Sequence, residues 1–169
     1  EQRQESLSLK LEQLNKFPLE RKTRMAVPGT PSVSLYAGRE EHLNAVLNLR
    51  NAARKELLQV APQFAGSFAT RKSLLEALRR KVVMKIIITN VTPKNKQQVL
   101  MAIQQGAQVR QLRDIKFFSL LIKDSSELLL GVHDDRKHEE RMTLHTKNPA
   151  LTTTLRQAFL RLWKQASPV

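Results

Sequence analysis

Residues 82–90, VVMKIIITN, constrain the fold of this chain more than any other stretch of its sequence. The segment is rich in β-branched side chains and is almost continuously apolar. A run of this kind is typical of a strand whose two faces are both covered by other elements. The sequence therefore predicts a sheet strand here, buried between two layers.

Strand-like and helix-like segments alternate on either side of this run. Strands are predicted at 32–38 and 56–62, and a helix at 40–55 presents its apolar residues on one broad face. A second helix is predicted within 66–80, where a serine and a glutamate, Ser73 and Glu76, have the spacing of a capping box. Alternation of this kind is typical of an α/β domain.

The later part of the sequence changes from alternation to hairpins. Thr92 and Pro93 predict the N-cap and first residue of a helix that ends at Gly106. Four strand candidates with short turns follow, and Asn148-Pro149 opens a last helix. We therefore expect an α/β fold with a mixed sheet flanked by helices.

A short leucine pattern precedes the predicted domain. Leu7, Leu11 and Leu14 follow the 4–3 spacing of a coiled-coil seam in an otherwise polar stretch. Three prolines and a glycine follow and break any helix. We expect the end of a dimerisation helix, a linker and the folded domain at residues 1–17, 18–31 and 32–169.

The chain is strongly basic, with 29 Lys and Arg against 15 Asp and Glu and a formal net charge of +14. A field of this sign attracts nucleic acid, anionic ligands or acidic partners. Residues 71–116 hold eleven of the basic residues against only Glu76 and Asp114. Aromatic residues make up 5% of the chain and do not alternate with basic ones, as they do where bases stack. Two interpretations stay open: solvated surface charge, or a nucleic-acid-binding module that acts through a basic surface.

Several function classes are excluded or disfavoured by what the sequence lacks. The absence of cysteine excludes disulfides and thiolate metal sites and suits a cytoplasmic protein. No apolar run of about 18 residues and no secretory signal is present, so we expect no membrane partner. No phosphate-binding loop, dinucleotide fingerprint or nucleophile elbow is found. Residues 133–140, HDDRKHEE, match no known metal spacing, so we expect a charged hairpin turn there and predict neither a metal nor a cofactor.

Phe117, Ser119 and Asp124 stand at the spacing of the H-x-K-x4-D signature of phospholipase D-type enzymes, but only the aspartate agrees. Phenylalanine has no lone pair to attack phosphorus, and serine has no fixed positive charge to hold a phosphate. Positions 117 and 119 lie on one face of a strand, so the geometry of such a site could survive without its chemistry. The alternative is an ordinary core strand with a turn-capping Asp124. Neither interpretation predicts an enzyme.

A second histidine–lysine pair satisfies part of the same signature. His145 and Lys147 have H-x-K spacing, but the fifth residue after Lys147 is Thr152, and Pro149 begins a helix. A phosphodiesterase that uses His145 and Lys147 is therefore an alternative that the surrounding sequence disfavours.

The order of these segments resembles the effector-binding domain of TrmB-like transcriptional regulators. The resemblance covers about residues 32–166 and is carried by four segments. They are a strand–helix–strand opening at 33–62, a helix leading into an apolar strand at 74–90, a strand–turn–strand at 117–132, and an asparagine–proline turn with a helix ending in Leu-Trp at 145–165. Lys81 departs from the pattern, because such sequences usually turn with glycine before the strand.

The resemblance implies a phospholipase D-like fold that has lost hydrolysis and senses a small-molecule effector instead. It also implies a homodimer that binds DNA through an upstream winged-helix domain. The helix with Leu7, Leu11 and Leu14 would be the end of the dimerising segment that joins the two domains.

An effector is expected outside the carboxyl ends of the strands, where loops leave polar groups unpaired. Asn90 and Ser119 would supply neutral hydrogen bonds, Phe117 an apolar wall, and Arg113 a charge for an anionic group. The alternative is that Arg113 pairs with Asp114 at a turn and Asn90 caps the following loop.

Overall fold

The apolar segment at 82–90 forms strand β3 (Val83–Ile88) inside the sheet, as its pattern predicts. Four of the six side chains of this strand are at most 1% exposed: Met84, Ile86, Ile87 and Ile88. The structure, a computed structural model, describes residues 33–61, 67–113, 115, 118–132 and 141–169.

Eight strands of the described residues form one mixed sheet in the order β1-β7-β6-β5-β2-β3-β4-β8. Strands β2, β3 and β4 pair in parallel, and the other neighbours pair antiparallel. From the alternating part of the sequence, β2 and β3 form the parallel centre, but β1 pairs antiparallel with β7 at the edge of the sheet. Of the four predicted hairpin strands, β5, β6 and β7 form the antiparallel flank, whereas β4 joins the parallel centre beside β3. The other strands are β1 (Val33–Ala37), β2 (Glu56–Ala61), β4 (Gln108–Gln111), β5 (Phe118–Lys123), β6 (Glu127–Val132), β7 (Met142–Thr146) and β8 (Ser167–Pro168).

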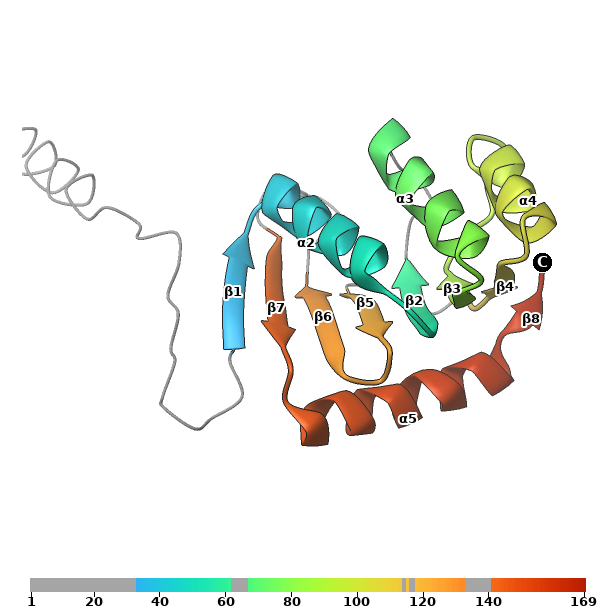
Figure 1. Ribbon diagram of the computed structural model, residues 1–169. Helices are drawn as coiled ribbons and strands as arrows, with labels where there is room; N and C mark the ends of the chain where they lie inside the picture. Colours follow the sequence, from blue (N-terminus) through green and yellow to red (C-terminus); the bar gives the residue numbers. More distant parts are fainter. Residues whose placement is uncertain (1–32, 62–66, 114, 116–117, 133–140) are drawn as a thin grey trace, which may run out of the picture.

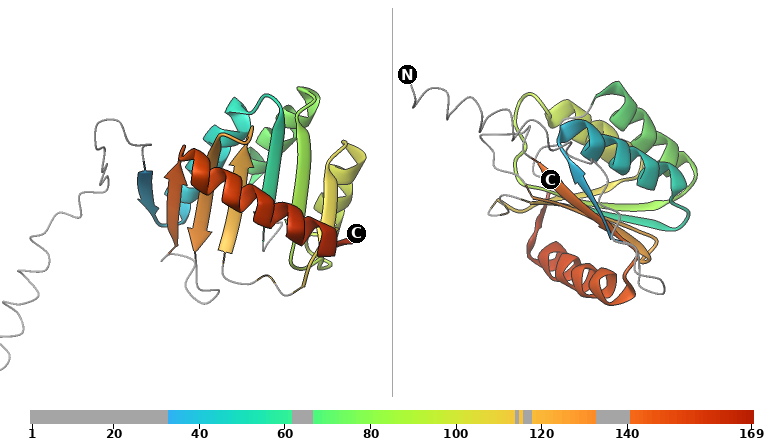
Figure 2. Two further views of the ribbon diagram at one scale, coloured as in Figure 1. Left: turned by 90° about the horizontal axis from the view of Figure 1, so that it is seen from below. Right: turned by 90° about the vertical axis from the view of Figure 1, so that its left-hand side faces the viewer.

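Helices cover both faces of the sheet, as Figures 1 and 2 show. One face carries three helices and the other carries α5: the helices are α2 (Arg39–Ala52), α3 (Phe68–Arg79), α4 (Lys96–Gln104) and α5 (Pro149–Gln165). Successive side chains of a strand point to opposite faces. Leu57 therefore belongs to the core under α2, α3 and α4, while its neighbour Leu58 packs with Phe159 of α5.

The start of α3 differs from the prediction. The Ser67 side chain caps this helix by accepting a hydrogen bond from the Thr70 amide at 3.4 Å. Ser73 instead lies buried in the helix interior, where its hydroxyl donates to the Thr70 carbonyl at 3.0 Å. The predicted capping box of Ser73 and Glu76 is therefore wrong, because the same spacing also arises inside a helix.

The start of α4 also lies later than predicted, whereas the start of α5 agrees. The Thr92 amide donates to Asn95 Oδ1 at 2.8 Å, and this turn delays the helix until after Asn95. Thr92 is therefore not the N-cap. At α5, Asn148 Oδ1 accepts from the Leu151 amide at 3.1 Å and Pro149 is the first helical residue, which confirms the prediction.

Two helices end in the same left-handed turn but use different residues for it. After α4, Gly106 has a φ of 101°. After α3, Lys81 has a φ of 63°, and the Val82 amide donates to the Ala77 carbonyl at 3.1 Å, as in a Schellman motif. Lys81 thus adopts the conformation for which glycine would be expected, at a cost of about 1 kcal/mol for a residue with a Cβ.

Several predictions concern residues outside the described part of the chain and stay predictions. These are the leucine seam (Leu7, Leu11 and Leu14), the linker at 18–31, Phe117, and the charged turn at 133–140. Within the described part, none of the helices is long and apolar enough to cross a membrane.

Candidate functional site

Ser119 occupies the position on β5 where the phospholipase D signature has lysine. It lies directly opposite Gly131 of β6, and an added Cβ on Gly131 would come within 2.5 Å of Ser119 Oγ and 3.3 Å of the His42 ring. His42 in turn shares a 2.9 Å hydrogen bond with Thr143 Oγ1. Ser119 Oγ is buried and has no hydrogen-bond partner among the described residues. The serine is therefore packed against its neighbours and presents no charge.

Asp124, the one agreeing letter of the signature, lies at the other end of β5. Its carboxylate accepts hydrogen bonds from the backbone amides of Arg54 at 3.0 Å, Lys55 at 2.7 Å and Glu56 at 3.0 Å. Partial burial raises the pKa of Asp124, but these amide bonds outweigh it and hold the pKa below its ordinary value. At about 3.3 Å per residue, Asp124 is roughly 17 Å along the strand from Ser119. Asp124 thus has a capping role, as in the alternative interpretation, but it caps the distant loop between α2 and β2.

The strand ends behave as expected, but the predicted effector residues do not contact one another. Because β2, β3 and β4 are parallel, their carboxyl ends meet at one edge, and the pairing of Leu120 with Val60 brings the Ser119 end of β5 to that edge. Asn90 is exposed there, and its carbonyl accepts from the Asn95 side chain at 2.9 Å. Arg113 is exposed after β4. No hydrogen bond or ion pair within the described residues joins Asn90, Arg113 and Ser119, and Phe117 lies outside them.

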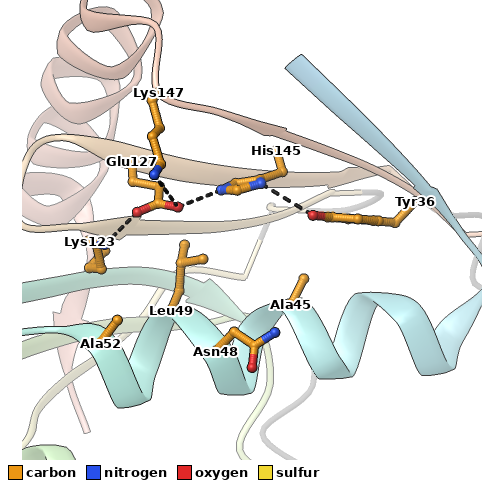
Figure 3. A pocket seen from close by; sticks show the side chains of 9 residues that line it. All are labelled: Tyr36, Ala45, Asn48, Leu49, Ala52, Lys123, Glu127, His145 and Lys147. Atoms are coloured by element: carbon orange, nitrogen blue, oxygen red, sulfur yellow. Dashed lines mark hydrogen bonds and ion pairs between the residues drawn. The ribbon is translucent and has the colours of Figure 1, made fainter. Parts of the chain in front are cut away.

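A cavity of about 300 Å³, lined by both polar and apolar side chains, lies between α2 and the antiparallel flank of the sheet (Figure 3). Tyr36 of β1, Glu127 of β6 and His145 of β7 form its sheet side. The other lining residues are Lys123, Lys147 and four residues of α2, namely Ala45, Asn48, Leu49 and Ala52.

Glu127 is the centre of a row of hydrogen-bonded side chains along the sheet side of this cavity. Its Oε2 pairs with Lys123, while Oε1 accepts from His145 Nε2 at 2.7 Å and has Lys147 Nζ at 3.9 Å. Burial raises the pKa of Glu127, but the hydrogen bonds from Lys123 and His145 outweigh it and hold the pKa below its ordinary value. Glu127 is therefore a carboxylate that stays ionised although its side chain is only 10% exposed.

Tyr36 completes the row through a 3.3 Å contact between its hydroxyl and His145 Nδ1. A carboxylate can only accept, so the His145 proton lies on Nε2 when the ring is neutral, and Nδ1 accepts from the tyrosine hydroxyl. The predicted pair of His145 and Lys147 is thus brought together, but both side chains face the same carboxylate. Sequence reasoning missed Glu127, although a lone carboxylate at the start of the apolar strand ELLLGV must find partners when it is buried.

Exposed basic side chains gather at the edge where β2 and β3 begin. The Val83 amide donates to the Lys55 carbonyl at 2.9 Å, which joins the two segments that carry them. The acidic neighbours at this edge are engaged, since Glu56 binds Arg156 and Asp124 binds backbone amides. We call the following five exposed residues the basic edge: Arg54, Lys55, Arg79, Arg80 and Lys81.

One basic residue of this region is not part of the surface. The Arg50 guanidinium is buried, and burial lowers its pKa to about 10. It donates to the Thr70 carbonyl at 2.9 Å and to Gln59 Oε1 at 2.8 Å, so it joins α2, α3 and β2. This arginine therefore has a structural role. Across the described residues, no group of three or more metal-ligating side chains is found.

Solved structures of other proteins have the same fold, whereas comparisons of sequence find no relative. No known family profile and no curated protein sequence matches this chain. Among solved structures it is similar to TrmBL2, an archaeal chromatin protein, with a TM-score of 0.69 and 20% identity, over 99% of this chain and 62% of TrmBL2. It is also similar to Nuc from Salmonella typhimurium, a phospholipase D family member, with a TM-score of 0.71 and 19% identity over 83% of this chain and 99% of Nuc. NucT from Helicobacter pylori has a TM-score of 0.70 and 12% identity over 83% of this chain and all of NucT.

These similarities confirm the phospholipase D-like mixed sheet that the sequence resemblance implies. The chain spans 62% of the length of TrmBL2. One fold thus serves both a chromatin protein and phospholipase D-type proteins, so the residues at the site, rather than the fold, must separate the two.

Proposed function

We propose that this chain is an effector-sensing and dimerising domain of a TrmB-like transcriptional regulator and that it does not hydrolyse phosphodiesters. The observation that carries the proposal is Ser119. On a phospholipase D-like sheet, it puts a packed, uncharged hydroxyl where hydrolysis needs a phosphate-binding cation. Similarity of fold to TrmBL2 supports the same assignment.

The other histidine–lysine pair offers no better nucleophile. His145 Nε2 is engaged with Glu127 at 2.7 Å and Nδ1 with Tyr36 at 3.3 Å, so both ring nitrogens have partners. An imidazole that attacks phosphorus needs one nitrogen with a free lone pair. This arrangement favours a binding role over phosphodiester hydrolysis.

In the proposed regulator, the effector binds at the edge that carries Asn90, Arg113, Phe117 and Ser119. DNA is bound by a separate winged-helix domain, and Leu7, Leu11 and Leu14 contribute to a homodimer. The protein acts in the cytoplasm. The two exposed side chains at this edge, Asn90 and Arg113, are the ones available to a ligand.

A hydrolysis assay tests the central claim. The purified chain and its His145→Ala variant are incubated with bis-p-nitrophenyl phosphate, and release of nitrophenol is followed. We expect no turnover above buffer for either protein. Turnover that disappears in His145→Ala would show a phosphodiesterase instead.

Effector binding and dimerisation need their own measurements. Small molecules that co-purify with the chain can be identified by mass spectrometry and titrated back, with Arg113→Ala as the test variant and Arg161→Ala, an exposed arginine of α5, as the matched control. Binding equal in both variants would place the effector elsewhere.

Light scattering should report a dimer, and a strict monomer would contradict the dimerising role.

A second candidate function is nucleic-acid binding, and the basic edge is the observation that favours it. Five exposed cations lie together, and Glu56 is paired with Arg156, so the local charge is net positive. Such binding to duplex DNA should weaken steeply with salt, because each neutralised phosphate releases counterions. Replacing the cations at 79–81 with glutamine should reduce that salt dependence, whereas Lys164→Gln on α5 should not. Unchanged binding in the triple variant would exclude the basic edge.

A further inference from the structure

The cavity beside α2 exists because small side chains of the helix face polar ones of the sheet. Ala45 and Ala52 line its helix side, where larger residues would fill the space. The volume of about 300 Å³ lies at the lower end of the range for small-molecule sites. The sheet side of the cavity is polar and its helix side is mostly apolar, so the space suits a small ligand whose polar groups face the sheet.

The charges around the cavity leave one cation in surplus. Lys123 and His145 already satisfy the two oxygens of Glu127. Lys147 approaches the same carboxylate only to 3.9 Å, and its side chain is 61% exposed. Because the carboxylate is compensated without it, Lys147 can turn to another anion at little cost.

Two uncharged groups of the cavity also keep hydrogen-bonding capacity. The Asn48 side chain has no hydrogen bond to another described residue, and it lies in the cavity wall. The Tyr36 hydroxyl contacts His145 alone within the described residues, which leaves a lone pair on its oxygen. Asn48 lies on α2, Tyr36 on β1 and Lys147 just after the end of β7, so the three side chains border one space from different segments of the chain.

We propose that this cavity binds a small polar ligand through an anionic oxygen group, a phosphate or a carboxylate, that pairs with Lys147. Asn48 and Tyr36 bind the uncharged part of the ligand. The site is distinct from the effector edge of the proposed function, because Lys123 in its wall is four residues along β5 from Ser119, roughly 13 Å. A metal ion is a poor occupant, since both oxygens of Glu127 already accept hydrogen bonds, one from Lys123 and one from His145.

Titration with simple anions tests this site without knowledge of the natural ligand. The full chain, labelled with ¹⁵N, is titrated with inorganic phosphate, acetate or chloride at constant ionic strength, and the NMR shifts of the Asn48 side-chain amide and the His145 ring are followed. We expect phosphate or acetate, but not chloride, to move these signals in a saturable way. Tighter binding of phosphate than of acetate would indicate a ligand with a phosphate group, and the reverse order would indicate a ligand with a carboxylate.

Matched variants separate this site from general attraction to a basic protein. Lys147→Gln removes one charge-assisted hydrogen bond and should weaken anion binding about tenfold. Tyr36→Phe should weaken it less, and Lys96→Gln, which removes the same charge from an exposed position on α4, should leave it unchanged. Equal loss in Lys147→Gln and Lys96→Gln, or no saturable shift with either oxyanion, would overturn the proposal. The anion titration measures neither hydrolysis nor oligomeric state, so a negative result here would not contradict the proposed function.

Discussion

Replacing Asp124 tests whether the aspartate of the phospholipase D spacing has a structural role in this chain. Its carboxylate accepts from three consecutive backbone amides that lie 68 to 70 residues earlier in the sequence. These bonds fix the loop between α2 and β2 against the turn between β5 and β6. Asp124 itself has a φ of 52°, in the left-handed region that asparagine and glycine also tolerate.

The expected loss of stability follows from these contacts. A net value of about 1 kcal/mol for each of three bonds, reduced because the side chain is partly exposed to water, gives about 2 kcal/mol for Asp124→Gly. Asp124→Ala adds about 1 kcal/mol, because alanine disfavours the left-handed conformation. Asp124→Asn keeps an oxygen for Lys55 and Glu56 but turns its NH₂ group toward the Arg54 amide, so we expect a loss of about 1 kcal/mol.

The same carboxylate predicts a dependence on pH. Because the pKa of Asp124 is lower in the folded state, its stabilisation is present above the unfolded-state pKa of about 3.9 and is lost as the pH falls through the folded-state value. The difference in stability between the parent and Asp124→Asn should therefore be constant near neutral pH. It should shrink below about pH 4.

Thermal and urea unfolding followed by circular dichroism measures these effects. For a domain of this size, each kcal/mol corresponds to about 3 °C in Tm, so Asp124→Ala should lower Tm by about 9 °C. Anion binding at the α2 cavity should be unchanged in the folded variants. A Tm of Asp124→Ala equal to that of the parent would refute the structural role.

Two further substitutions test the packing and the backbone around the site. Lys81→Gly should stabilise the domain by about 0.5 kcal/mol, because relief of the left-handed conformation outweighs the added flexibility of the unfolded chain. Its control is Lys81→Gln, which removes the charge but keeps the Cβ. If Lys81→Gln rather than Lys81→Gly were more stable than the parent, the backbone argument would be contradicted. Gly131→Ala should destabilise by about 1–3 kcal/mol because its Cβ would lie 2.5 Å from Ser119 Oγ. Adding Ser119→Ala, which removes that oxygen, should restore part of the loss in urea unfolding, and strict additivity of the two changes would argue against this contact.

Local features of the fold could be predicted because they depend on residues close in sequence. The apolar run of β3, the Asn148 cap and the glycine after α4 are each set by periodicity or by backbone preference within a few residues. The same reasoning failed at Ser73, whose spacing to Glu76 fits a capping box but whose burial inside α3 is a tertiary property.

The sequence by itself determined the α/β layering, a mixed sheet with hairpins in its later part, and the absence of a histidine and a lysine at the phospholipase D spacing of Asp124. Only the tertiary structure decided which polar groups meet. Tyr36 and His145 are 109 residues apart, and His145 and Glu127 are 18 apart, yet they form one row because β1, β7 and β6 are neighbours in the sheet. Strand order depends on the packing energy of the whole sheet, whereas periodicity reports only which face of its own strand a side chain occupies.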